Sequence, residues 1–196
     1  DVAAEYINPK ESDFSWDINN LTALKFGYYD KPDLGTPIED ILDEYGKAIK
    51  GSFRRDRIDL KWGELDDYDQ DEDSFYYRSI REMELAFKKE GDRYYLQNIS
   101  YSGDYRKAKV AYMPSDYYDK LKVGDPKTGK GGVSYKEVIG DNAVLYLTMS
   151  AGEDIETDEV ITKMRIQFNS SGSDEYKLTF VKQADGDFLL AKKGAD

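Results

Sequence analysis

The chain has 196 residues, of which 39% are hydrophobic, 14% aromatic and 35% charged, and its formal net charge is −12. This length suits one large domain or two small ones, and the aromatic content is too high for a disordered chain. The absence of cysteine and histidine excludes disulfides, thiol nucleophiles, Ser-His-Asp triads and histidine-ligated zinc. The negative charge disfavours nucleic acids and anionic membranes as partners.

The first segment, residues 1–13, is polar, contains Pro9 and shows no helical or strand periodicity. Such a segment is typical of an N-terminal arm or tether. Its first five residues lack the basic and apolar regions of a signal peptide, and no run of 18 apolar residues occurs in the chain. We therefore expect a mature exported protein, with an export signal and a lipid-anchoring cysteine upstream of Asp1.

Residues 14–100 form the first predicted structural unit. Ser15 is a candidate N-cap for a helix over residues 16–23. Thr36 as N-cap and Pro37 in the first turn begin a second helix with apolar residues at three-and-four spacing, which ends at Gly46. Alternating apolar residues then predict strands over residues 48–53, 58–62, 80–87 and 94–100.

The same order of elements follows in residues 115–196, after a predicted linker over residues 101–114. Ser115 is the candidate N-cap of the first helix of this unit, and Gly140 ends the second helix. The predicted strands are residues 143–150, 160–168, 176–181 and 188–192.

The two halves also resemble each other residue by residue at an offset of 97. Leu24, Lys25, Phe26 and Gly27 match Leu121, Lys122, Val123 and Gly124, and the residues Gly35, Asp40, Ile41 and Leu42 match Gly132, Glu137, Val138 and Ile139. A period this long indicates compact subdomains rather than a solenoid. The predicted fold class is α+β: two tandem repeats, each with two short helices packed on a four-stranded antiparallel meander sheet.

Two motifs suggest ligands. Gly124–Lys130 has the spacing G-x-x-x-x-G-K of a phosphate-binding loop, but Gly131 stands where the magnesium-binding serine or threonine belongs. We therefore expect a structural loop and no cofactor. The second motif is a row of alternating carboxylates, Asp67, Asp69, Asp71 and Asp73. It resembles a calcium-binding loop but lacks the required glycine and glutamate. This segment is therefore a metal site, a partner-binding loop or a solvated linker.

Aromatic residues supply the candidate recognition surface. Tyrosine offers a large contact area at low entropic cost and is enriched at interfaces. On alternating strands one of each adjacent pair points inward, so core packing is the competing interpretation. The candidate partner-binding residues are Trp62, Tyr68, Phe75, Tyr76, Tyr77 and Tyr95.

A family resemblance rests on the run Leu-x-Phe/Val-Gly, a short loop, a helix that ends at Tyr45-Gly46, and the meander that follows. This order resembles the beta-lactamase inhibitory protein and is similar to small lipoproteins of the outer-membrane assembly machinery. With the loop at Gly124-Asp125 and Gly129–Gly132, the tandem form resembles cell-surface lipoproteins of Gram-positive bacteria. The resemblance implies a concave sheet surface that binds a protein.

These observations predict a non-catalytic extracytoplasmic binding protein, a lipoprotein of the cell surface, that presents a sheet surface to a protein or cell-wall polymer. Its membrane contact would be the N-terminal lipid alone. No catalytic residue is assigned. A purely structural envelope protein is one alternative, and a hydrolase that uses two carboxylates is another.

Overall fold

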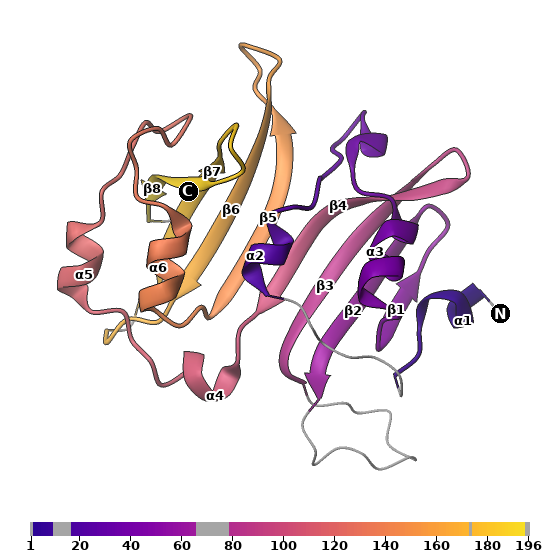
Figure 1. The fold of residues 1–196 in the computed structure, drawn as a ribbon, viewed down its shortest axis with the longest axis horizontal. Coiled ribbons are helices and arrows are strands. Elements are labelled where there is room, and N and C mark those ends of the chain that lie inside the picture. Colours follow the sequence, from indigo (N-terminus) through magenta and orange to yellow (C-terminus); the bar gives the residue numbers. More distant parts are fainter. Residues whose placement is uncertain (1, 10–16, 66–78, 173, 195–196) are drawn as a thin grey trace. The chain divides into compact units, whose positions relative to one another are not determined.

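The computed structural model describes residues 2–9, 17–65, 79–172 and 174–194 (Figure 1). The chain divides into two compact units, Asp1–Tyr101 and Ser102–Asp196. We refer to them as unit 1 and unit 2 and describe each by itself.

Unit 1 begins with short helical segments and continues with strands. The helical segments are α1 (Val2–Tyr6), α2 (Ile18–Leu21), the 3-10 turn η1 (Pro32–Leu34) and α3 (Ile38–Tyr45). The strands are β1 (Lys50–Phe53), β2 (Arg57–Leu65), β3 (Ser79–Glu90) and β4 (Arg93–Ser102).

Unit 2 has a similar composition of elements. Its helices are α4 (Tyr105–Ala108), α5 (Ser115–Lys120) and α6 (Tyr135–Asp141). Its strands are β5 (Tyr146–Glu153), β6 (Val160–Phe168), β7 (Tyr176–Lys182) and β8 (Phe188–Lys193). The predicted strands of the whole chain therefore lie within three residues of the observed ones at each end.

The predicted fold class is nevertheless wrong. We expected two four-stranded sheets with helices packed on each, but the eight strands belong to one antiparallel sheet in the order β1-β2-β3-β4-β5-β6-β7-β8. Strands account for 42% of the described residues and helices for 21%. Alternation in a sequence shows which side chains share a face of a strand. It does not show where a sheet ends, because that depends on backbone hydrogen bonds between strands.

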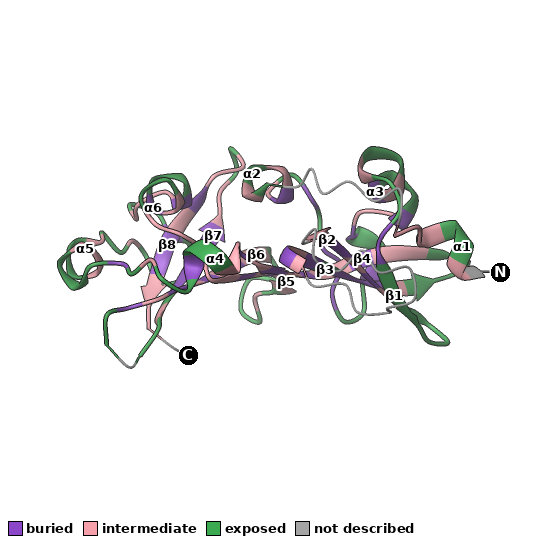
Figure 2. Cartoon of the chain, turned by 90° about the horizontal axis from the view of Figure 1, so that it is seen from below, coloured by how far each residue is buried: buried purple, intermediate pink, exposed green. Residues whose placement is uncertain are grey.

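The core of unit 1 lies on the side of its strands that α3 covers (Figure 2). Leu60 pairs with Leu85 and Trp62 pairs with Met83 across β2 and β3, and all four side chains have no exposed surface. Burying a large apolar side chain completely contributes roughly 1.5–3 kcal/mol. The remaining core side chains of this unit include Leu21, Phe26, Ile38, Ile41, Ile58, Phe87, Leu96 and Ile99.

The core of unit 2 follows the same alternation. Ile166 of β6 lies between Leu147 of β5 and Leu178 of β7, and all three are buried. From α6, the ring of Tyr135 packs edge-on against Phe188 of β8 with ring centroids 5.8 Å apart. Most buried side chains of these strands therefore face α6, and every second residue faces away from it. Thr179 and Val181 of β7 are also buried, at positions that face away from α6.

Helix ends follow local sequence signals. As predicted, α3 ends at Gly46, whose φ of 76° lies in the left-handed region that favours glycine. The Ser134 hydroxyl caps α6 by accepting a hydrogen bond from the Lys136 amide at 3.2 Å. Three predicted N-caps are wrong. The N-cap residue of α2 is Asp17 rather than Ser15, that of α5 is Pro114 rather than Ser115, and α3 has Pro37 in place of Thr36. The predicted helix end at Gly140 is also wrong, because α6 continues to Asp141.

In unit 1, a loop rich in glycine, residues 24–37, docks on β4 through the backbone. The Gly27 amide donates to the Leu96 carbonyl at 2.8 Å, and the Leu96 amide donates to the Thr36 carbonyl at 2.9 Å. The Thr36 amide in turn donates to the Lys25 carbonyl at 3.0 Å. We refer to this segment as glycine loop 1.

In unit 2, glycine loop 2, residues 121–134, docks on β8 with the same pattern. The Gly124 amide donates to the Leu190 carbonyl at 2.8 Å, and the Leu190 amide donates to the Val133 carbonyl at 2.9 Å. The Val133 amide donates to the Lys122 carbonyl at 2.9 Å. The loop residues in these bonds are those of glycine loop 1 shifted by 97 positions.

Both loops need glycine where they meet the strand. A Cβ atom added to Gly35 would lie 2.0 Å from the Leu96 oxygen, and one added to Gly132 would lie 2.1 Å from the Leu190 oxygen. Distances this short are well inside van der Waals contact, so any other residue would push the loop off the strand.

The segment predicted as an arm contains α1 and contacts unit 1. The Ala48 amide donates to the Tyr6 carbonyl at 2.8 Å, and the Asn8 amide donates to the Ala48 carbonyl at 2.9 Å. These bonds form a parallel bridge between Ile7 and Ala48. They supply backbone partners just before β1, at one end of the strand order.

Glycine loop 2 supplies a stability test. A Cβ atom at Gly124 would lie 2.4 Å from the Gly129 oxygen, whereas Gly140 in α6 has no atom within 4 Å of that position. We expect Gly124→Ala to destabilise the protein by about 2–3 kcal/mol through steric overlap. Gly140→Ala is expected to stabilise it by roughly 0.5–1 kcal/mol through helix propensity. Urea unfolding measures both, and equal midpoints for the two variants would contradict this account of the loop.

Candidate functional site

Trp62 does not belong to an exposed recognition surface. Its side chain has no exposed area, and its indole Nε1 donates to the Gly46 carbonyl at 3.2 Å. Because β2 alternates, Trp62 shares the inward face with Leu60. It is a core residue that also binds the end of α3, and we remove it from the candidate set.

Tyr95 lies on β4 and is half-buried. Its ring centroid lies 5.7 Å from the Arg93 guanidinium carbon, and its backbone forms an isolated bridge with Pro37. The remaining aromatic and acidic candidates lie outside the described residues: Tyr68, Phe75, Tyr76, Tyr77, Asp67, Asp69, Asp71 and Asp73.

In the Gly124–Lys130 segment, backbone amides bind the side-chain carboxylate of Asp125, a residue of the same segment. Asp125 Oδ1 accepts hydrogen bonds from the Lys127 amide at 2.8 Å and the Thr128 amide at 2.9 Å. A phosphate-binding loop presents such amides to the phosphate oxygens. Here the Asp125 carboxylate already satisfies them, which supports the expected structural role of the loop.

Charge is distributed unevenly between the units. Residues 1–101 include 14 basic and 24 acidic residues, and residues 102–196 include 14 basic and 16 acidic residues. The net charges are therefore −10 for unit 1 and −2 for unit 2. The overall charge of the chain is no guide to the surface of unit 2.

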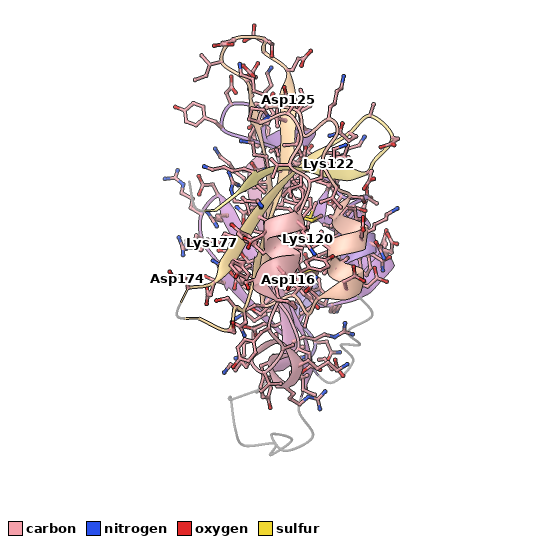
Figure 3. All side chains as sticks on the ribbon, turned by 90° about the vertical axis from the view of Figure 1, so that its left-hand side faces the viewer. Asp116, Lys120, Lys122, Asp125, Asp174 and Lys177 are labelled. Carbon is pink, nitrogen blue, oxygen red and sulfur yellow. The ribbon has the colours of Figure 1, made fainter. Side chains whose placement is uncertain are left out.

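Four basic residues occupy the side of β6, β7 and β8 that faces away from α6. In the register, Arg165 lies opposite Thr179, and Thr179 lies opposite Lys192. On β6, Lys163 lies two residues before Arg165 and opposite Val181. On β7, Lys177 lies two residues before Thr179 and opposite Gln167. Figure 3 shows Lys177 on the side of the strands away from α6. We refer to the outward positions of β5–β8 as the basic face.

The basic face has no acidic residue at its described outward strand positions. On β5 these positions hold Tyr146, Thr148, Ser150 and Gly152, and on β6 Ile161 and Gln167 accompany the two cations. In unit 1 the corresponding side of the strands is neutralised, because Lys61 Nζ lies 3.7 and 3.8 Å from the Glu82 and Glu84 carboxylates. Several basic side chains on one strand face, with no carboxylate at its outward strand positions, favour an anionic ligand.

A cavity of about 470 Å³ lies beside the β5–β6 hairpin. Ser150, Lys163 and Arg165 line it from the basic face, and Ile155 and Glu156 line it from the hairpin tip. The Ile155 side chain is 97% exposed. Lys127 Nζ lies 2.9 Å from the Glu156 carboxylate, so the hairpin tip contacts glycine loop 2.

A second cavity, of about 490 Å³, lies among α5, α6 and glycine loop 2. Its lining includes Lys120 and Lys122, which Figure 3 labels, and Tyr117 at one side. The Tyr117 hydroxyl donates to Asp141 Oδ2 at 2.9 Å. Burial and this hydrogen bond raise the pKa of Tyr117 to about 12.

The basic face escaped the sequence analysis, which concentrated on aromatic and acidic clusters. The signal was present in the spacing, because Lys163 and Arg165 alternate with apolar residues inside a predicted strand. Their charge was hidden by the net charge of the chain. Strand-by-strand charge on the outward positions would have revealed it.

Among the described residues, no helix is long and apolar enough to cross a bilayer. In that same part of the chain, no group of three or more acidic side chains is arranged to hold a metal ion. Comparison of the chain with protein-family models, curated proteins and solved structures finds no match. The resemblance to the beta-lactamase inhibitory protein and to surface lipoproteins therefore stays a prediction.

Asp125 supplies a pH test of the loop assignment. The Thr128 and Lys127 amides lower the pKa of the Asp125 carboxyl. A carboxyl with a lowered folded-state pKa stabilises the fold above its unfolded-state pKa of about 4, and this stability is lost as pH falls through the folded-state value. The unfolding temperature of the wild type should therefore be higher than that of Asp125→Asn at pH 5–8, and this difference should shrink below about pH 4.

The control for that experiment is Asp119→Asn, because the Asp119 side chain accepts no hydrogen bond from a described residue. Its difference from wild type should be smaller at neutral pH. A gap between wild type and Asp125→Asn that stays constant down to pH 2.5 would contradict the proposed role of the carboxylate.

Tyr117 supplies a test at high pH. Because its folded-state pKa is raised to about 12, Tyr117 stabilises the fold below its unfolded-state pKa of about 10, and this stability is lost as pH rises toward 12. Thermal unfolding from pH 8 to 12 should show a steeper loss for wild type than for Tyr117→Phe. Parallel curves for the two proteins would count against the Tyr117–Asp141 bond.

Proposed function

We propose that this protein is a non-catalytic binding protein of the cell envelope that presents the basic face of β5–β8 to its partner. The observation that carries the proposal is the set of four basic residues on one strand face without an acidic residue at the outward positions. Such a face attracts anionic groups locally even though the whole chain is negative. At physiological ionic strength, charges more than about 8 Å away are largely screened.

The predicted aromatic surface is revised in this proposal. Trp62 is buried and Tyr95 is half-buried, so the described aromatic candidates provide little exposed area. The partner-binding surface moves from aromatic side chains to basic ones. The extracytoplasmic, lipid-anchored location rests on the family resemblance and stays part of the proposal.

A carboxylate-based hydrolase is the second candidate, because acidic residues border the hairpin cavity. Two of them have structural partners. The Asp154 carboxylate accepts hydrogen bonds from the Glu156 and Thr157 amides at 2.8 and 3.4 Å, and Glu156 pairs with Lys127. These contacts stabilise the hairpin turn, so we favour binding over hydrolysis.

Co-sedimentation with purified Gram-positive cell walls tests the proposed function. We expect the wild-type protein to sediment with the walls and the double variant Lys163→Glu/Lys177→Glu to stay largely in the supernatant, because each substitution reverses a charge on the basic face. The matched control is Lys130→Glu/Lys136→Glu, which makes the same change in net charge at exposed positions outside that face.

Three results separate the candidates. Retention of the wild type and the control but not of the basic-face variant supports the proposal. Equal behaviour of all three proteins, whether bound or unbound, would exclude this face as the binding surface. Release of soluble sugars from the walls would favour the hydrolase instead.

A further inference from the structure

The first and last strands of the sheet differ in how their outer edges are covered. On β8, the Leu190 amide and carbonyl bond to glycine loop 2, and Ser134 forms a further bridge with Leu189. On β1, the outermost strand of unit 1 (Figure 1), the segment 6–8 bonds only to Ala48, just before the strand. Among the described residues, the chain therefore covers the edge of β8 and leaves that of β1 open.

The backbone of β1 has unpaired groups along this edge. The Arg54 amide donates to the Arg57 carbonyl at 2.9 Å, and in an antiparallel ladder such bonded pairs alternate with unbonded ones. In the register of β1 and β2, Gly51 and Phe53 therefore occupy unbonded pairs. Their N–H and C=O groups point away from β2 and bond to no described residue. Such groups are a template for one more strand.

Basic side chains lie along the open edge. Residues 50–57 are all exposed and include one acidic residue, Asp56. Lys50, Arg54 and Arg55 form no side-chain hydrogen bond and no ion pair with any described residue. The neutralisation of charge on this side of unit 1 therefore does not extend to β1.

The carboxylates on the same side of the neighbouring strands have basic partners. Asp59 of β2 pairs with Arg57 at 3.1 Å, and Lys61 Nζ lies 3.7 and 3.8 Å from the carboxylates of Glu82 and Glu84 on β3. A strand added to β1 would lie about 14 Å from β3, because neighbouring strands are about 4.8 Å apart. At that distance charges are largely screened. The added strand would therefore interact mainly with the basic residues of the edge.

The other side of the edge is aromatic. Gly51 and Phe53 lie opposite Leu60 and Ile58, which are buried, so these two positions share the core side of β2. The Phe53 side chain is 37% exposed, and its ring centroid lies 5.9 Å from that of Tyr6. An added strand would place every second side chain on this aromatic pair.

Carboxylates lie near the aromatic pair. Burial raises the pKa of the Tyr6 hydroxyl, and the negative charges of Glu5 and Glu39 raise it further. An acidic ligand side chain on this side would be repelled by them. The aromatic side of the edge therefore favours apolar side chains, and the opposite side, with Lys50, favours acidic ones.

A second copy of the chain is a poor partner for this edge. When two β1 strands pair antiparallel through the backbone groups described above, Lys50 of one copy lies opposite Arg54 of the other. Like charges at directly opposite positions destabilise a strand pair, and lysine on an edge strand protects against such pairing. The same charges attract a strand that carries acidic residues at alternate positions.

The backbone groups also distinguish a peptide from a nucleic acid. A phosphate backbone accepts hydrogen bonds but does not donate them to carbonyl oxygens. The outward carbonyl groups of Gly51 and Phe53 need donors, which an extended peptide supplies together with acceptors. The edge therefore fits a peptide strand better than a polyanion.

We propose that β1 binds an extended segment of a partner protein as an additional strand, and that acidic residues alternate with apolar residues in this segment. The acidic residues face Lys50 and Arg54. The apolar residues face the ring pair of Tyr6 and Phe53. Backbone hydrogen bonds supply affinity, and the alternating side chains supply specificity. This surface uses no residue of the basic face, so the proposal goes beyond the proposed function.

The test measures binding of a fluorescently labelled peptide, Thr-Glu-Val-Glu-Val-Glu-Thr, to the full chain by fluorescence anisotropy. We expect binding that weakens as NaCl rises from about 50 to about 400 mM. A peptide with lysine in place of glutamate should bind at least about tenfold more weakly. A peptide that is N-methylated at alternate residues keeps its charges but loses backbone donors, and it should also bind more weakly. Equal binding of the methylated and unmethylated peptides would overturn strand addition.

Charge variants of the protein test the basic side of the edge. Lys50→Glu/Arg54→Glu should bind the peptide at least about tenfold more weakly than wild type. The matched control, Lys130→Glu/Lys136→Glu, makes the same change in net charge in unit 2 and should bind within about twofold of wild type. The neutral variant Lys50→Gln/Arg54→Gln, checked for an unchanged unfolding temperature, should also bind more weakly. Unchanged affinity in both edge variants would contradict the proposal.

A pair of variants at Phe53 isolates the backbone contribution. Phe53→Ala removes the ring and keeps the outward N–H group, whereas Phe53→Pro removes both. Proline is tolerated on an edge strand where its nitrogen faces outward. We expect the proline variant to bind the peptide about two- to tenfold more weakly than the alanine variant, because it lacks one backbone hydrogen bond. Equal affinities of these two variants would show that the edge backbone is not used.

Amide hydrogen exchange, followed by NMR, locates the bound peptide. The amides of Gly51 and Phe53 should exchange rapidly in the free protein and slowly with the peptide bound, while the Ser52 amide, which faces β2, should stay slow in both states. Protection of the first two amides before peptide is added would contradict an open edge. Concentration-dependent dimers that Lys50→Glu/Arg54→Glu abolishes would assign the edge to a second copy, and equally tight binding of single-stranded RNA would overturn the peptide assignment.

Discussion

The contact that the rest of each unit depends on is the close approach of a glycine loop to a strand backbone. Gly35 meets the Leu96 carbonyl and Gly132 meets the Leu190 carbonyl at distances that leave no room for a Cβ atom. Backbone hydrogen bonds on both sides of each glycine fix the loop in place. The loop then carries the following helix, α3 or α6, onto one side of the strands, where buried apolar residues stabilise it.

This docking decides which strand faces are left for function. In unit 2, α6 packs on Phe188 through Tyr135, so the inward positions of β5–β8 become core. The outward positions include Lys163, Arg165, Lys177 and Lys192, together with the apolar residues Ile161, Val181 and Leu189. The basic face is therefore a consequence of where the loop places the helix, and not of a separate structural motif.

Local charge and net charge lead to opposite expectations here. The net charge of −12 argues against anionic partners, but most of the excess acidity belongs to unit 1. On the strands of unit 1, Lys61 and Arg57 have acidic neighbours, whereas the basic face of unit 2 has none at its outward strand positions. Because salt screens distant charges, the arrangement within about 8 Å of a ligand dominates binding.

The sequence by itself determined the local structure of this protein. Apolar alternation placed all eight strands within three residues, and glycine and proline marked the ends of α3, because these signals act over a few residues. Only the tertiary structure decided that the strands share one sheet, that Trp62 is core and that Asp125 fills its own loop. Those outcomes depend on hydrogen bonds and burial between segments distant in the chain, which alternation and residue type do not encode.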